Sequence, residues 1–133
     1  QTLDRIELAK ALDRRLQVEG RSLDVLVQVK TADEASKHGL APTGLVGFLD
    51  ALAPYSALRV KGLMTVATQT ADQALVRACF AQLRELRDRA RETAGSHVEL
   101  NRLSMGMSGD FALAIAEGAT EVRIGSALFG ARQ

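Results

Sequence analysis

Two segments near the C-terminus contain the residues best suited to chemistry. The first reads Ser104-Met105-Gly106-Met107-Ser108-Gly109-Asp110, and the second begins at Glu121 and includes Gly125 and Ser126. In each, a short apolar run typical of a strand leads to a glycine and a small hydroxyl residue. Such turns let backbone N–H groups point outward together, and a helix starting there adds partial positive charge. Two turns of this kind on neighbouring strands predict a cup for a phosphate group.

The elements that must position these turns are strands and helices in regular alternation. Leu23–Val29 is apolar enough for a strand buried on both faces. In the long helix, Leu75, Val76, Cys79, Phe80, Leu83 and Leu86 form an apolar stripe, with Thr70 or Asp72 as the cap. We expect strands at residues 23–29, 58–66, 98–103 and 121–124, and helices at residues 3–20, about 42–53, about 72–94 and 108–117.

Four strands alternating with helices predict a parallel α/β sheet with right-handed crossovers. An open doubly wound sheet is one solution, but that fold usually binds phosphate at its first strand–helix turn. Here the glycine-bearing turns follow the last two strands, as in a (β/α)8 TIM barrel. A barrel needs about 250 residues, and this chain has 133. We therefore expect one partial domain, residues 1–133, that is the C-terminal half of a barrel and pairs with an N-terminal half of the same protein.

Composition narrows the range of partners. The chain has 17 basic and 16 acidic residues, 4% aromatic residues and no tryptophan. We therefore expect neither nucleic acid nor a membrane surface as a partner. The single cysteine, Cys79, fits a reducing cytoplasmic location. His38 and His97 have no further ligands at metal-binding spacing, so we predict no metal site.

Four motifs give the sequence a resemblance to a known family. They are Gln28-Val29-Lys30 with Glu34, Lys37 and Gly39; Gly62-Leu63-Met64; Ser104 to Ser108 with Asp110; and Val122 to Gly130. In order and spacing the chain resembles the pyridoxal phosphate homeostasis protein family, which has an alanine-racemase-like, fold-type III barrel. One departure is Lys30, where the family usually has asparagine.

The resemblance implies that the chain binds pyridoxal 5′-phosphate (PLP) as a non-catalytic carrier and is a monomer when complete. It implies a phosphate cup around Ser104, Ser108 and Gly125, and an Arg123 that faces the ring nitrogen. A positive charge there keeps that nitrogen unprotonated. The Schiff-base lysine of the family is expected in the missing N-terminal half. The candidate cofactor-binding residues are Met64, Ser104, Gly106, Met107, Ser108, Arg123, Gly125 and Ser126.

Other interpretations of these residues remain open. Ser108 can simply cap a helix, Arg123 can form a salt bridge at the barrel end, and Met64 can fill the core. A fold-type III racemase or decarboxylase is the alternative function. Its second acid–base residue is often a tyrosine, and the one tyrosine here, Tyr55, follows a helix end on the wrong side of a barrel. An unrelated sugar-phosphate isomerase would need a well-placed carboxylate, for which Glu99 and Asp110 are poor candidates.

Overall fold

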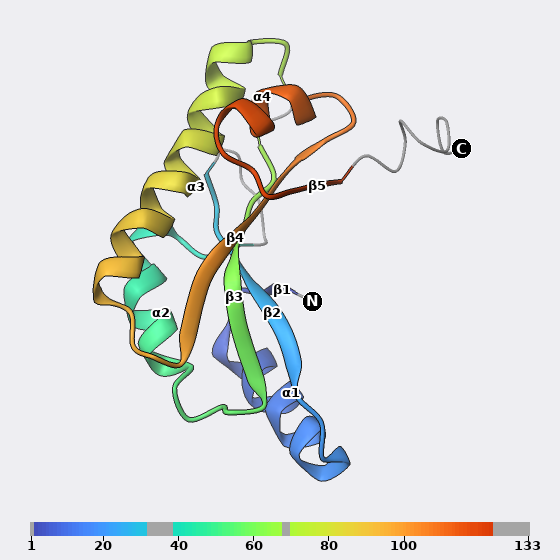
Figure 1. The fold of residues 1–133 in the computed structure, drawn as a ribbon, viewed down its shortest axis with the longest axis vertical. Coiled ribbons are helices and arrows are strands. Elements are labelled where there is room, and N and C mark those ends of the chain that lie inside the picture. Colours follow the sequence, from blue (N-terminus) through green and yellow to red (C-terminus); the bar gives the residue numbers. More distant parts are fainter. Residues whose placement is uncertain (1, 32–38, 68–69, 124–133) are drawn as a thin grey trace.

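A five-stranded parallel sheet forms the centre of the computed structural model, which describes residues 2–31, 39–67 and 70–123. Its strands lie side by side in chain order, so the predicted parallel α/β architecture is confirmed (Figure 1). The strands are β1 (Thr2–Leu3), β2 (Leu23–Gln28), β3 (Leu58–Met64), β4 (Val98–Met107) and β5 (Glu121–Arg123).

Helices connect successive strands, as parallel pairing requires. Gly20 ends the first helix with φ 65°, and Asp72 caps the third by accepting the N–H groups of Ala74 and Leu75. Among the described helices, none combines the length and the apolar composition needed to cross a bilayer. The helices are α1 (Ile6–Glu19), the 3-10 turn η1 (Pro42–Gly44), α2 (Leu45–Ala51), α3 (Gln73–Thr93) and α4 (Phe111–Ala116).

The main hydrophobic core lies between the sheet and these helices. Phe80 and Leu83 of α3 have no exposed surface, and neither have Leu63 of β3 and Leu103 of β4. Cys79 is buried on the predicted stripe. Leu75 is not on the stripe, because its side chain is 53% exposed. The stripe begins one residue later, at buried Val76, since α3 starts at Gln73 and its first turn extends beyond the core.

Several predicted boundaries were wrong. Leu3 belongs to β1 rather than to the first helix, because it pairs with Val27 and is 1% exposed. Ser104–Met107 was expected to form a turn, but β4 continues through it. Pairing keeps the segment in the sheet, since Ser104 pairs with Met64 of β3 and Met107 with Arg123 of β5, with an irregularity in register between Ser104 and Met107. The helix that follows is correspondingly shorter than the predicted range of 108–117.

Candidate functional site

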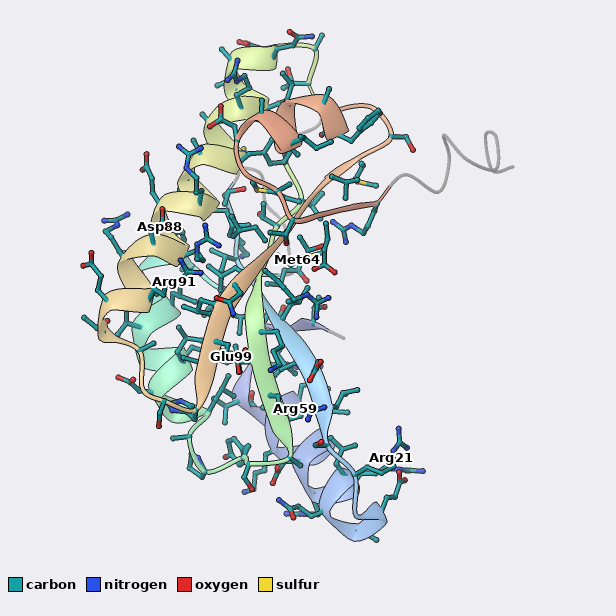
Figure 2. The ribbon with its side chains drawn as sticks, in the orientation of Figure 1. Arg21, Arg59, Met64, Asp88, Arg91 and Glu99 are labelled. Atoms are coloured by element: carbon teal, nitrogen blue, oxygen red, sulfur yellow. The ribbon has the colours of Figure 1, made fainter. Side chains whose placement is uncertain are left out.

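Three side chains from neighbouring strands form a row near the carboxyl edge of the sheet. Gln28 of β2 pairs with Met64 of β3, which pairs with Ser104 of β4. We call these three residues the edge row. Met64 is 6% and Ser104 is 7% exposed. Figure 2 shows Met64 where β3 ends, with Arg59 towards the other end of the strand.

The edge row faces away from the helices. Val27, Leu63 and Leu103, which precede the row residues along each strand, belong to the hydrophobic core. Successive side chains of a strand point to opposite faces. The edge row therefore lies on the face that would be the inside of a closed barrel, which is where a barrel binds its ligand.

Arg123 reaches over the sheet from the end of β5. Its Nη2 donates to the backbone oxygen of Thr65, just beyond β3, at 3.4 Å. The hydroxyl of Thr65 is itself buried and donates to the backbone oxygen of Val29 at 2.7 Å, and it lies 2.9 Å from the hydroxyl of Thr31. Thr65 thus connects the segment after β2 with Arg123 at the end of β5, through its hydroxyl and its backbone oxygen respectively.

The turn between β4 and α4, Met107–Asp110, differs from the expected cup. The backbone N–H of Met107 donates to Oδ1 of Asp110 at 2.6 Å, and the N–H of Asp110 donates to the oxygen of Met107 at 3.0 Å. Asp110, not Ser108, is the N-cap residue of α4. The interpretation of Ser108 as a simple helix cap is therefore wrong, and so is the expectation that the helix begins at Ser108. The turn would have to bind an anion with its remaining N–H groups and hydroxyls.

Gly106 is required by packing in this structure. Its φ is 103°, and a Cβ built there would lie 2.7 Å from the Cβ of Ala114 in α4. The sequence interpretation assigned Gly106 to the close approach of a phosphate. The structure shows α4 occupying the space beside it, so Gly106 fixes how the Met107–Asp110 turn lies on the sheet.

Two carboxylates near the site, Glu117 and Glu121, are paired with arginines. Glu121, which pairs with Ser104 in the sheet, binds Arg102, and this contact raises the pKa of the guanidinium. Glu117, just after α4, binds Arg77 and Arg84, and these hydrogen bonds lower its carboxyl pKa. Both pairings neutralise negative charge that would otherwise oppose a bound anion.

The structure brings most of the predicted site residues to one edge. Met64 and Ser104 are neighbours, Met107 and Arg123 are paired, and Gly106 and Ser108 join these pairs to the turn. Gly125 and Ser126 lie outside the described residues. For Arg123, the contact found in the described part of the chain is with a backbone oxygen rather than with the carboxylate of a salt bridge.

Gln28 and Thr65 were not among the predicted site residues, although both lie beside the candidate site in the structure. A signal was present, because each is a polar residue between two apolar neighbours, Gln28 between two valines and Thr65 between Met64 and Val66. Their positions depend on how neighbouring strands align, which that signal does not specify.

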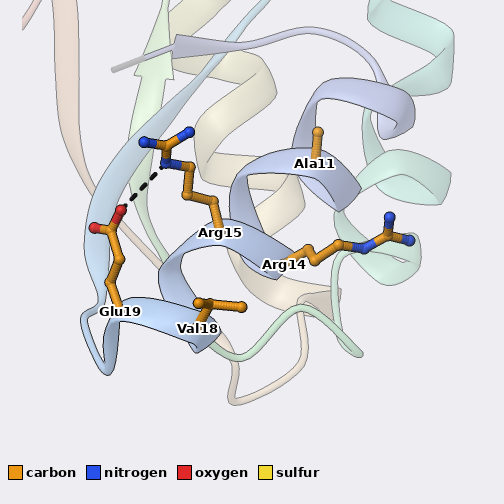
Figure 3. A pocket seen from close by; sticks show the side chains of 5 residues that line it. All are labelled: Ala11, Arg14, Arg15, Val18 and Glu19. Atoms are coloured by element: carbon orange, nitrogen blue, oxygen red, sulfur yellow. Dashed lines mark hydrogen bonds and ion pairs between the residues drawn. The ribbon is translucent and has the colours of Figure 1, made fainter.

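One surface hollow in the described part of the chain lies on a single helix, away from the edge row. Figure 3 shows this hollow of about 390 Å³ along α1, lined by Ala11, Arg14, Arg15, Val18 and Glu19. The Arg15–Glu19 ion pair lies within it, at 3.2 Å. This hollow draws all its residues from one helix and none from the strand ends. Within the described ranges, no three histidine, cysteine or acidic residues gather as a metal site would require.

Comparison with known proteins gives consistent matches. The protein described as "Pyridoxal phosphate homeostasis protein" from Pseudomonas aeruginosa is 43% identical over 131 residues, which is 98% of this chain and 54% of that protein. The chain thus spans about half the length of the curated relatives that it matches.

Solved structures of similar proteins agree with the sequence matches. PipY of Synechococcus elongatus with PLP bound superposes with a TM-score of 0.87 at 38% identity, over 96% of this chain and 58% of PipY. Alanine racemase from Streptomyces coelicolor has a TM-score of 0.73 at 16% identity, over 98% of this chain and 34% of that enzyme, which shows the fold alone. The family profile described as alanine racemase, N-terminal domain, matches residues 1–133. The chain therefore belongs to the alanine racemase N-terminal domain family, and its relative from Pseudomonas aeruginosa, at 43% identity, carries the name pyridoxal phosphate homeostasis protein.

Proposed function

We propose that this chain is the C-terminal half of a PLP-binding barrel that buffers and delivers the cofactor in the cytoplasm. The observation that carries the proposal is the gathering of Met64, Ser104 and Arg123 at one carboxyl edge. PipY, 38% identical to this chain, was solved with PLP bound. The reducing location is supported by the single cysteine in the sequence.

The side chains at this edge fit the chemistry of PLP. The phosphate needs hydrogen-bond donors, and Ser104, Ser108 and the remaining N–H groups of the turn can supply them. The ring needs an apolar surface, which Met64 and Met107 can offer. Gly125 and Ser126, outside the described residues, would complete the phosphate cup. When bound, PLP supplies a reactive aldehyde and an electron-accepting ring.

Arg123 favours a carrier over an enzyme. If Arg123 lies opposite the ring nitrogen of bound PLP, its fixed positive charge would oppose protonation of that nitrogen, and an unprotonated ring would accept electrons less well. Tyr55 precedes β3 and so lies at the amino end of the strand, opposite the edge row. Within the described residues it therefore cannot serve as the second acid–base group that a racemase needs.

The test is a PLP titration of the full-length protein, followed by its visible absorption spectrum. Borohydride reduction and intact mass should then show one cofactor per chain, attached to a lysine outside this segment. Arg123→Gln should shift the spectrum and weaken binding, whereas the matched variant Arg59→Gln, at the far end of β3, should leave both unchanged. Wild-type protein that gives neither an absorption band nor an adduct would refute PLP binding. Equal effects of the two variants would refute the role of Arg123.

A further inference from the structure

The short helix α4 is not stable on its own and depends on contacts with the rest of the protein. It has six residues, whereas isolated helices below about 12–15 residues are marginal in water. Its orientation must therefore come from contacts with the rest of the protein. The same contacts orient the Met107–Asp110 turn, which leads directly into it.

At its amino end, α4 and the turn form one packed unit. Two hydrogen bonds join Met107 and Asp110, and the N–H of Ala114 donates to the oxygen of Asp110 at 3.2 Å. Ala114 is fully buried, and its Cβ lies against Gly106. A movement of α4 would therefore carry the turn with it.

At its carboxyl end, α4 is fastened to α3 by Glu117. Oε2 accepts from Nε and Nη2 of Arg77 at 3.0 and 2.7 Å, and Oε1 accepts from Nη1 of Arg84 at 2.8 Å. The same Nη1 donates to the backbone oxygen of Glu117 at 2.9 Å. The Glu117 side chain is 13% exposed, so these contacts are partly shielded from water. Helix α3 is long and anchored in the core by Phe80 and Leu83.

We propose that Glu117 is a positioning residue for phosphate recognition. By fastening α4 to α3, it holds the Met107–Asp110 turn in the orientation in which its donors can reach the cofactor phosphate. Glu117 itself does not touch the cofactor. This inference rests on the proposed function, because it concerns the same phosphate site.

The experiment compares the affinities of the full-length protein for PLP and for pyridoxal, which lacks the phosphate. Glu117→Gln should weaken PLP binding by about tenfold or more, because one misaligned hydrogen bond to a charged phosphate costs at least that factor. Pyridoxal affinity should stay within about twofold of wild type, since no phosphate is involved. Arg77→Gln leaves the Arg84 contacts with Glu117 in place and should also lower the ratio of PLP affinity to pyridoxal affinity. This variant replaces Glu117→Gln in the test if Glu117→Gln does not fold.

The matched control is Glu19→Gln. Glu19 is also a carboxylate between two arginines, Arg15 at 3.2 Å and Arg21 at 2.9 Å, but it lies at the end of α1. The Glu19→Gln substitution should leave the affinities for PLP and for pyridoxal unchanged. An unchanged PLP-to-pyridoxal ratio in Glu117→Gln and Arg77→Gln, or an equal loss for both ligands, would overturn the inference alone. A wild-type protein with no preference for PLP over pyridoxal would overturn the phosphate site of the proposed function, and the inference with it.

Discussion

Gly106→Ala tests directly how α4 is seated on β4. Gly106 has φ 103°, and an added Cβ would lie 2.7 Å from Ala114 Cβ, 3.2 Å from Val122 Cγ1 and 3.3 Å from Phe111 Cα. A left-handed backbone costs an L-residue about 1–2 kcal/mol. Overpacking of a well-packed site adds about 1–3 kcal/mol. The two effects together predict a loss of about 2–5 kcal/mol of unfolding free energy.

The matched control, Gly109, lies three residues away, in the turn that follows β4. At Gly109 an added Cβ would meet nothing within 4 Å, and the residue is exposed. Gly109→Ala should therefore be neutral or stabilise by up to about 1 kcal/mol, through the reduced entropy of the unfolded chain. Urea unfolding of both full-length variants, followed by circular dichroism, measures the difference. If Gly106→Ala costs no more than Gly109→Ala, α4 does not pack against Gly106 as described, and the argument about the turn fails.

Three further predictions concern the elements that support the site. Phe80→Ala should cost about 3–5 kcal/mol in urea unfolding because Phe80 is fully buried, whereas Leu75→Ala, at a side chain that is 53% exposed, should cost much less; similar losses would contradict the described face of α3. Asp72→Ala should lower the unfolding free energy by about 1 kcal/mol, because α3 loses its N-cap. Asp72→Asn keeps a hydrogen-bond acceptor and should therefore retain most of the stabilisation by the cap. The carboxyl pKa of Glu117 is lowered from 4.5 by Arg77 and Arg84, so its contribution to stability is complete above pH 4.5 and is lost as the pH falls through the lowered value. The difference in unfolding free energy between wild type and Glu117→Gln should therefore shrink below pH 4.5, and a constant difference down to strongly acidic pH would contradict the ion pairs.

Sequence patterns predicted the elements that local chemistry specifies. The apolar periodicity of α3 from Val76 onward and the glycine at the end of α1 are each encoded within a few residues, and the structure has both. Of the two predicted caps of α3, Thr70 and Asp72, the structure has Asp72. The parallel alternation also followed from local signals, because each strand is a short apolar run between helical segments.

Features set by pairing between distant segments could not be predicted. The serine, glycine and methionine residues of Ser104–Met107 favour a turn by composition, yet pairing on both sides holds them in β4. The edge row depends on irregularities in register, at Val25/Leu26 and at Val60/Gly62, which shift the strands relative to one another. No local pattern marks these irregularities, so the alignment of Gln28 with Met64 and Ser104 required the structure. Leu3 was misassigned for the same reason, since its spacing suits a helix but its partner is Val27.

The strand order β1-β2-β3-β4-β5 has a consequence for how the protein is made. Because neighbours in the sheet are also successive strands in the chain, each strand leaving the ribosome finds its pairing edge already synthesised. None of these five described strands must wait for a later one to be inserted between it and its neighbour. Loop-closure entropy is limited to single strand–helix–strand units, which favours stepwise growth of the sheet during translation. The residues of the candidate site are then assembled last, when β5 brings Arg123 to the oxygen of Thr65.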